Sequence, residues 1–255
     1  MIEKYHIVQL ETLIMENARP LPEACAYLKA LKKEGIPYLI LTEQTGRNRE
    51  DLADYLRSAG FPAIPASRIY TSAMAAVDWI LSAYPGRLRT DYLGGAAIAE
   101  AIQGGGMFLT HDKCDWFMIG LSRSAGYQDY SDIYDMLAHG TNLISLDSRK
   151  GQEKDGRMTL GSGAFARMLE YASGKEAVAC GRGSILFLTQ ALKYAQVKKS
   201  QAVCVGNDFQ KDILPALKLG METVLVTEGN SIMDQGITKD LHPTYIVENL
   251  SGLAR

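Results

Sequence analysis

The sequence predicts an α/β protein: a Rossmann-like core built on a parallel sheet, with a second α/β domain inserted into it. Two observations lead to this prediction. At both ends of the chain, short runs that are apolar on both faces alternate with amphipathic helical stretches, as in βα units with buried parallel strands. The glycine-rich middle of the chain separates two ends that need each other to complete one sheet.

The N-terminal part contains two βα units. The apolar run 5–10 predicts a strand, and the Pro-Leu-Pro-Glu stretch at 20–23 opens a helix that runs to Lys33 and stops at Gly35. The run 37–41 predicts the next strand, 42–48 a polar loop, and 49–59 a helix that ends at Gly60. Two successive units of this kind indicate a parallel sheet.

The C-terminal part repeats the alternation. Strands are predicted at 177–180, 202–205, 223–226 and 245–247, and helices at 184–195 and 209–219. We therefore predict a core domain of residues 1–83 and 176–255, with an inserted domain at 84–175. The insert has strand candidates at 115–119 and 142–146, helical sequence near 127–134, and a charged segment, SRKGQEKDGR, at 148–157.

Composition excludes several classes of protein. The 255 residues carry a net charge of −2, with 47% hydrophobic and 22% charged residues, so nothing indicates a nucleic-acid or membrane partner. The N-terminal apolar run is too short and too interrupted for a signal peptide or a membrane span. The four cysteines are far apart, without zinc-ligand spacing, and Cys180 and Cys204 are predicted core residues. A cytoplasmic protein with reduced thiols is the simplest expectation.

Five segments at predicted strand ends occur in a recognisable order: VQLETL, LILTEQTGR, YTSAMAA, VACGRGS and VGNDFQKD. With this order the chain resembles the haloacid-dehalogenase-like phosphatases. The resemblance is to the class IIA branch, which has a large inserted C2-type cap and includes 4-nitrophenylphosphatases and sugar-phosphate phosphatases. It covers nearly the whole chain, and GSGAF at 161–165 resembles the return from cap to core. In this family an aspartate attacks phosphorus, a second aspartate protonates the leaving group, and Mg²⁺ is the cofactor.

This chain departs from the family pattern at the position of the nucleophile. Gln9 stands there, and a neutral amide is neither an anionic nucleophile nor an anionic metal ligand. Glu11 occupies the acid/base position, and Thr12 replaces the glycine of the tight bend. The covalent step of the family therefore has no evident agent in this sequence.

The phosphate-binding positions also differ. Thr42 is retained, Glu43 stands in place of asparagine, and Arg182 stands in place of lysine. A carboxylate about 4 Å from a phosphate charge costs about 4 kcal/mol at an effective dielectric constant of 20. We therefore expect phosphate affinity to fall by roughly three orders of magnitude unless Glu43 is protonated or turned away. Two alternatives remain open: Glu43 and Arg182 pair with each other across the phosphate site, or they belong to a functional anion site.

The metal-binding loop keeps only part of its charge. Asn207 stands in place of the first aspartate, with Asp208 beside it and Asp212 retained. Since Gln9 and Asn207 are both neutral, we expect Mg²⁺ to bind weakly or not at all. In the cap, Asp147, Ser148 and Arg149 stand where relatives carry a substrate loop, and the charged segment 148–157 is predicted to be a solvated loop rather than a specificity element.

Two classes of function are compatible with these residues. The first is a phosphatase-inactive member of the fold that binds an unidentified small molecule in the cleft between cap and core, or that acts through assembly, including homo-oligomers. The second is a divalent-metal-dependent phosphatase or other hydrolase with a rearranged acidic site that includes Glu11, Asp208 and Asp212. Turnover of 4-nitrophenyl phosphate distinguishes them.

Overall fold

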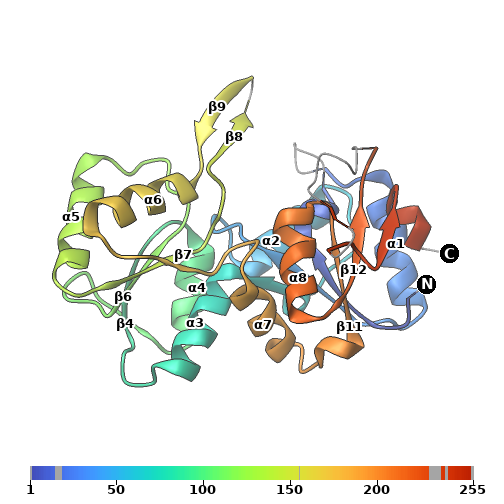
Figure 1. The fold of residues 1–255 in the computed structure, drawn as a ribbon, viewed down its shortest axis with the longest axis horizontal. Coiled ribbons are helices and arrows are strands. Elements are labelled where there is room, and N and C mark those ends of the chain that lie inside the picture. Colours follow the sequence, from blue (N-terminus) through green and yellow to red (C-terminus); the bar gives the residue numbers. More distant parts are fainter. Residues whose placement is uncertain (1, 15–18, 155, 230–236, 239–240, 254–255) are drawn as a thin grey trace. The chain divides into compact units, whose positions relative to one another are not determined.

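The structure, a computed structural model, describes the chain except for residues 1, 15–18, 155, 230–236, 239–240 and 254–255. The chain forms two compact units. Unit 1 comprises Met1–Thr42, Arg49–Tyr70 and Gly183–Arg255, and unit 2 comprises Glu43–Asn48 and Thr71–Arg182 (Figure 1). Each unit has its own sheet and its own hydrophobic cluster, so the predicted α/β class is confirmed. The predicted domain boundary at 84–175 stays a prediction.

Unit 1 contains a six-stranded sheet. Its strands, in spatial order, are β13 (Tyr245–Val247), β12 (Glu222–Val226), β11 (Ala202–Gly206), β1 (Tyr5–Gln9), β2 (Tyr38–Thr42) and β3 (Ile69–Thr71). The pairs β13–β12, β12–β11, β11–β1 and β1–β2 are parallel. Because β1 lies between β11 and β2, residues that follow β1 and β11 meet at the carboxyl edge of the sheet, where ligands bind in open α/β folds.

Helices cover both faces of this sheet. They are α1 (Pro22–Lys33), α2 (Arg49–Ser58), α7 (Ile185–Tyr194) and α8 (Leu214–Leu219), with short 3₁₀ turns η1 (Leu10–Thr12), η2 (Ala66–Arg68), η3 (Lys199–Gln201) and η6 (Leu250–Leu253). On one face, side chains of β1, β2, β11 and β12 pack against α1 and α2. On the other face, Leu225 of β12 packs against Phe209 and Ile213. Alternate residues of a strand point to opposite faces, which explains the two clusters.

The segment predicted as one helix over 209–219 has two parts. Its first turn, η4 (Phe209–Ile213), is π-helical, and α8 follows it. The N–H of Ile213 reaches back five residues to the carbonyl of Asp208, and Pro215 has no N–H with which to continue the α-helical ladder. Pro215 therefore favours the wider turn directly before α8.

In its described residues, unit 2 contains a five-stranded sheet, a separate two-stranded sheet and four helices. The strands, in spatial order, are β10 (Val178–Ala179), β7 (Asn142–Ser145), β6 (Trp116–Ile119), β4 (Arg89–Leu93) and β5 (Phe108–Leu109), and the adjacent strands are parallel. The helices are α3 (Ser72–Ala83), α4 (Ala96–Gly104), α5 (Tyr127–Ala138) and α6 (Ser162–Ser173). Helices α5 and α6 pack on the sheet through a cluster that includes Phe117, Ile133 and Leu169.

The charged segment 148–157 is not a loop throughout its length. Strand β8 (Gly151–Lys154) pairs antiparallel with β9 (Arg157–Leu160), and the two form a ribbon that extends from the rest of unit 2 (Figure 1). All four residues of β9 are exposed, as the expectation of a solvated segment requires. The prediction of a loop was wrong because a charge count does not reveal the antiparallel pairing of 151–154 with 157–160, whose turn contains Gly156 with a φ of +72°.

Among the described residues, no helix is both long enough and apolar enough to cross a bilayer.

The two strand-end cysteines are core residues, as predicted: Cys180 and Cys204 are fully buried. Burial raises the pKa of the Cys180 thiol well above its usual range, and the nearby Asp78 charge raises it further. The Cys180 thiol therefore stays protonated and unreactive at neutral pH.

Candidate functional site

Gln9 is the last residue of β1 and lies inside unit 1, with 1% of its surface exposed. Val8 is opposite Val205 in the parallel register, so Gln9 is level with Gly206 at the carboxyl edge of the sheet. Within the part of the chain that the structure describes, the side-chain oxygen Oε1 of Gln9 has no hydrogen-bond donor. The position that the resemblance assigns to a nucleophile thus holds a buried, neutral amide.

The turn after β1 is tied to the loop after β11. The side-chain amide of Asn207 donates a hydrogen bond from Nδ2 to the backbone carbonyl of Glu11 at 3.2 Å. Thr12, at the position that the resemblance assigns to a glycine, is fully buried at the end of the 3₁₀ turn η1. Asn207 thus joins two loops by a neutral hydrogen bond.

Asp212 closes the loop that follows β11. Its carboxylate oxygen Oδ2 accepts hydrogen bonds from the backbone N–H groups of Asn207 and Asp208, both at 3.0 Å, and its side chain is fully buried. Gly206 makes this possible, since a Cβ there would lie 2.2 Å from Cβ of Asp212. The retained aspartate is therefore part of the loop's own hydrogen bonding.

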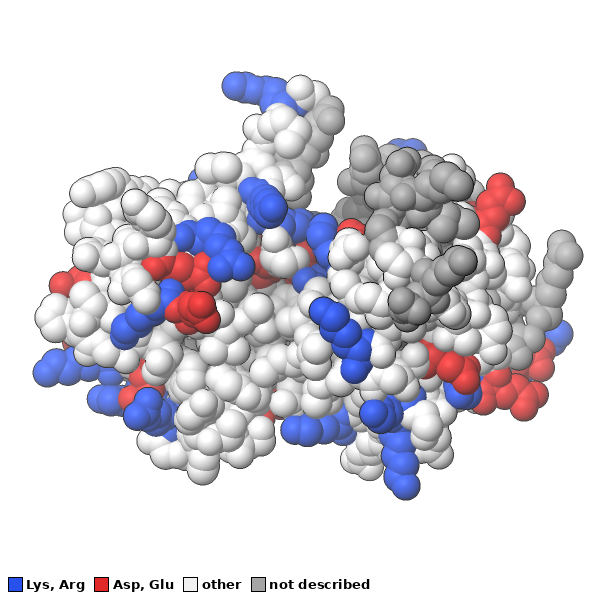
Figure 2. Space-filling model, viewed as in Figure 1, with Lys and Arg blue, Asp and Glu red and all other residues white. Residues whose placement is uncertain are grey.

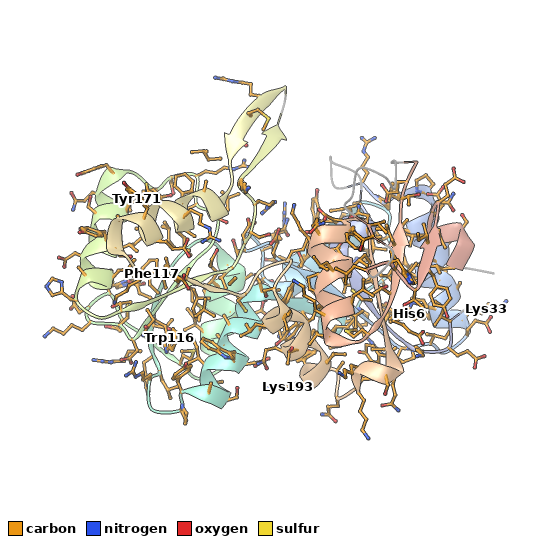
Figure 3. The ribbon with its side chains drawn as sticks, in the orientation of Figure 1. His6, Lys33, Trp116, Phe117, Tyr171 and Lys193 are labelled. Carbon is orange, nitrogen blue, oxygen red and sulfur yellow. The ribbon has the colours of Figure 1, made fainter. Side chains whose placement is uncertain are left out.

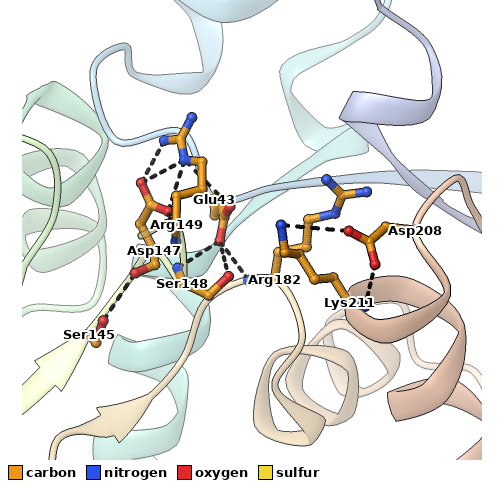
Figure 4. Close-up of polar contacts among 8 residues, drawn as sticks. All are labelled: Glu43, Ser145, Asp147, Ser148, Arg149, Arg182, Asp208 and Lys211. Atoms are coloured by element: carbon orange, nitrogen blue, oxygen red, sulfur yellow. Dashed lines mark hydrogen bonds and ion pairs between the residues drawn. The ribbon is translucent and has the colours of Figure 1, made fainter. Parts of the chain in front are cut away.

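Asp208 caps the π-helical turn that follows the same loop. Its Oδ1 accepts a hydrogen bond from the backbone N–H of Lys211 at 2.9 Å, and its Oδ2 lies 3.6 Å from Nζ of Lys211 (Figure 4). Sequence reasoning missed Lys211, although an aspartate followed three residues later by a lysine at the start of a helix was a usable signal.

Among the described residues, no group of three or more His, Cys, Asp or Glu side chains is arranged to hold a metal ion.

Glu43 is the centre of a second group of residues, in unit 2. Its side chain is 97% buried, and Oε2 accepts hydrogen bonds from the backbone N–H of Arg182 at 2.9 Å, from the backbone N–H of Ser148 at 3.2 Å and from the Ser148 hydroxyl at 3.4 Å. The other oxygen, Oε1, lies 3.7 Å from Nε of Arg149 (Figure 4). We call these donors of Arg182, Ser148 and Arg149 the Glu43 cradle.

Asp147 holds the guanidinium of Arg149 in place. Nε of Arg149 lies 2.9 Å from both carboxylate oxygens of Asp147, and the backbone N–H of Arg149 donates to Oδ1 at 2.8 Å. Asp147 is 99% buried, and its own carbonyl accepts a hydrogen bond from the Ser145 hydroxyl. Arg149 thus lies between two buried carboxylates (Figure 4).

The candidate residues are divided between the two units. Unit 1 holds Gln9, Glu11, Thr42, Asn207, Asp208 and Asp212, and unit 2 holds Glu43, Asp147, Ser148, Arg149 and Arg182. The backbone N–H of Arg182 donates a hydrogen bond to Glu43. The predicted pairing of the Arg182 guanidinium with Glu43 stays a prediction. Sequence reasoning did not foresee that the cap segment 147–149 would supply partners for Glu43, because this contact spans more than a hundred residues.

Comparisons with known proteins found matching family models and similar proteins. A family model described as haloacid dehalogenase-like hydrolase matches residues 10–107, and one described as HAD-hydrolase-like matches residues 179–253. The chain is 25% identical over 250 residues to the 5'-nucleotidase YutF of Bacillus subtilis, covering 97% of this chain and 96% of the relative. It is 24% identical to an acid sugar phosphatase of Staphylococcus saprophyticus, covering 97% and 95%.

A solved structure is also similar to this chain over nearly its whole length. NagD from Escherichia coli K-12 superposes with a TM-score of 0.88 at 25% identity, covering 98% of each chain. Fold, segment order and family matches together define the class: the chain belongs to the haloacid-dehalogenase-like superfamily. Within it, the chain falls in the capped class IIA branch, together with 4-nitrophenylphosphatase-like, NagD-like and acid sugar phosphatase relatives.

Proposed function

We propose that this protein is a phosphatase-inactive member of its family, which acts by binding a small molecule or through assembly, including self-association. The observation that carries the proposal is Gln9, buried at the end of β1 where the family pattern requires the attacking carboxylate. An amide oxygen is a weak, uncharged nucleophile, so an acyl-phosphate cannot form there as it does on aspartate.

The metal-binding residues support the same proposal. Mg²⁺ in proteins is held by carboxylates and by oxygens of the substrate phosphate, and it gives up its water reluctantly. Here Gln9 and Asn207 are neutral, and oxygens of Asp208 and Asp212 accept backbone hydrogen bonds of their own loop. This donor set fits Mg²⁺ poorly, and we propose that the ion binds weakly or not at all.

The alternative, a hydrolase with a rearranged acidic site at Glu11, Asp208 and Asp212, is less well supported. Asp212 is fully buried and holds two backbone N–H groups, and Asp208 caps the following turn and lies near Lys211. Carboxylates that already accept hydrogen bonds from their own loop are less available to bind a metal or attack a substrate.

The test is an assay with 4-nitrophenyl phosphate and Mg²⁺ on three forms of the protein. They are the wild type, a restored variant with Gln9→Asp, Glu43→Asn and Asn207→Asp, and a matched control with Gln9→Ala, Glu43→Asn and Asn207→Asp. The control differs from the restored variant only at the nucleophile position. Turnover in the restored variant alone supports the proposal.

Robust turnover by the wild type refutes the proposal. The assay should include a 5'-nucleotide and a sugar phosphate, because proteins similar to this chain are a 5'-nucleotidase and acid sugar phosphatases. Light scattering on a size-exclusion column tests self-association. We also propose a cytoplasmic location, which the four free cysteines support and which cell fractionation tests.

A further inference from the structure

Glu43 is surrounded by hydrogen-bond donors on nearly all sides. Two backbone N–H groups and one hydroxyl converge on Oε2, and a guanidinium lies against Oε1. Anion-binding sites are commonly formed by convergent backbone N–H groups together with an arginine. In this protein the anion is a side chain of the same chain.

The cradle is shaped for a carboxylate. Gly181 precedes Arg182, and a Cβ at Gly181 would lie 2.9 Å from Oε2 of Glu43, so the absence of a side chain leaves the space that the carboxylate fills. The two oxygens of Glu43 also have different partners: Oε2 takes the N–H and O–H donors, and Oε1 faces Arg149. A planar group with two oxygens satisfies both sets at once.

The donors are held in place independently of Glu43. Asp147 fixes the Arg149 guanidinium through both of its carboxylate oxygens. The Ser148 N–H lies in the backbone between these two residues. The loop around Arg182 follows β10, which pairs with β7 in the sheet of unit 2, and the N–H of Cys180 donates to the carbonyl of Ser145. Removing the Glu43 side chain therefore takes Oε2 away from the N–H groups of Arg182 and Ser148, while Asp147 still holds Arg149 beside them.

We propose that the Glu43 cradle is a carboxylate-binding site whose resident ligand is the Glu43 side chain, and that it accepts a small free monocarboxylate when this side chain is removed. In the native protein Glu43 is thus a fixed ligand that anchors the segment 43–48 to the rest of unit 2. This inference does not depend on the proposed function, because it concerns binding within unit 2 and not hydrolysis.

The experiment is a rescue of stability. Glu43→Ala is unfolded by heat in sodium formate, in sodium acetate and in sodium chloride at equal ionic strength. We expect a lower Tm than that of the wild type in chloride, and a saturable recovery of at least half of the loss in formate or acetate. Binding of ¹³C-formate, followed by NMR, should saturate over the same range of concentration.

Three controls make the result specific. Glu43→Gln keeps the cradle filled and should show no rescue. The double variant Glu43→Ala/Arg149→Gln should lose the recovery of Tm that formate or acetate gives to Glu43→Ala. Glu50→Ala, which removes an exposed carboxylate from α2, should respond to formate no differently from the wild type. Equal Tm values for Glu43→Ala in formate, acetate and chloride refute the proposal, and so does an equal effect of formate on Glu50→Ala.

The proposal stays testable if Glu43→Ala does not fold in chloride. Refolding from urea is then compared in formate and in chloride, and Glu43→Ser is treated in the same way. Recovery of folded protein in formate alone supports the carboxylate site, whereas failure of both variants to recover in formate contradicts it. Phosphatase activity does not enter this readout, so a failure here is distinct from a failure of the proposed function.

Discussion

Replacing Asp212 tests whether this aspartate is a structural residue or a remnant of a metal site. Its Oδ2 holds the N–H groups of Asn207 and Asp208 in a fully buried position. Hydrogen bonds to charged groups contribute about 1.5 to 3 kcal/mol each, so two of them contribute about 3 to 6 kcal/mol. Since some relaxation follows their loss, we expect Asp212→Ala to lower the free energy of unfolding by about 3 kcal/mol.

The conservative variant separates charge from hydrogen bonding. Asp212→Asn keeps an oxygen acceptor for the two N–H groups, and we expect it to lose only about 1 kcal/mol. As a matched control in the same unit, Asp54→Ala removes an exposed carboxylate paired with Arg57 and should cost at most about 0.5 kcal/mol.

Urea unfolding measures these differences. With a slope of about 3 kcal/mol per molar urea, a loss of 3 kcal/mol moves the midpoint down by about 1 M. Hydrogen exchange of the Asn207 and Asp208 amides reports on the loop directly and should accelerate in Asp212→Ala. Both tryptophans, Trp79 and Trp116, lie in unit 2, so their fluorescence is not the appropriate probe. The structural role would be refuted if Asp212→Ala lost less than about 1 kcal/mol in the free energy of unfolding. It would also be refuted if Mg²⁺ stabilised the wild type but not Asp212→Ala.

Three further outcomes are expected. Gly206→Ala should destabilise unit 1 by about 3 kcal/mol or more, because its Cβ would overlap that of Asp212, whereas Gly86→Ala meets open space and should change urea stability little. Arg149→Met should cost about 2 kcal/mol in thermal unfolding, since it leaves two buried carboxylates without this cation while its own side chain is one-third exposed. Burial lowers the pKa of His6 from 6.5, so stability should fall as pH drops below about 6.5, and His6→Gln should flatten this pH dependence of the urea midpoint.

The sign of the His6 effect follows from its hydrogen bonds. In the neutral ring Nε2–H donates to the carbonyl of Ile2, while Nδ1 accepts from the hydroxyl of Tyr27 at 2.6 Å. Protonation would place two donors face to face unless the Tyr27 hydroxyl turned, so the folded state favours the neutral ring while the unfolded chain binds the proton. A urea midpoint with the same pH dependence in wild type and variant would contradict this account. Equal stability of Gly206→Ala and Gly86→Ala, or of Arg149→Met and wild type, would contradict the other two.

Local sequence patterns were sufficient for most of the strands and helices. The alternation of apolar runs and amphipathic stretches identified β1, β2, β11 and β12, because strands buried on both faces are mostly apolar. The same patterns did not reveal the ribbon of β8 and β9, because these strands pair with each other and β9 is exposed, so no buried apolar run marks them. They also treated the π-helical turn before α8 as ordinary helix, because it differs from one only in hydrogen bonding.

The sequence by itself determined which chemical groups stand at the strand ends: an amide at Gln9, a carboxylate at Glu43 and the retained Asp212. It also shows that the amide of Gln9 carries no charge with which to attack phosphorus or attract Mg²⁺. Only the tertiary structure decided which partners these groups have. Glu43 finds its donors more than a hundred residues away, at Ser148 and Arg182, and Asp212 turns back to its own loop. The residue type fixes the charge and the hydrogen-bonding capacity of a side chain. Its partners, however, depend on which distant segments fold into contact with it.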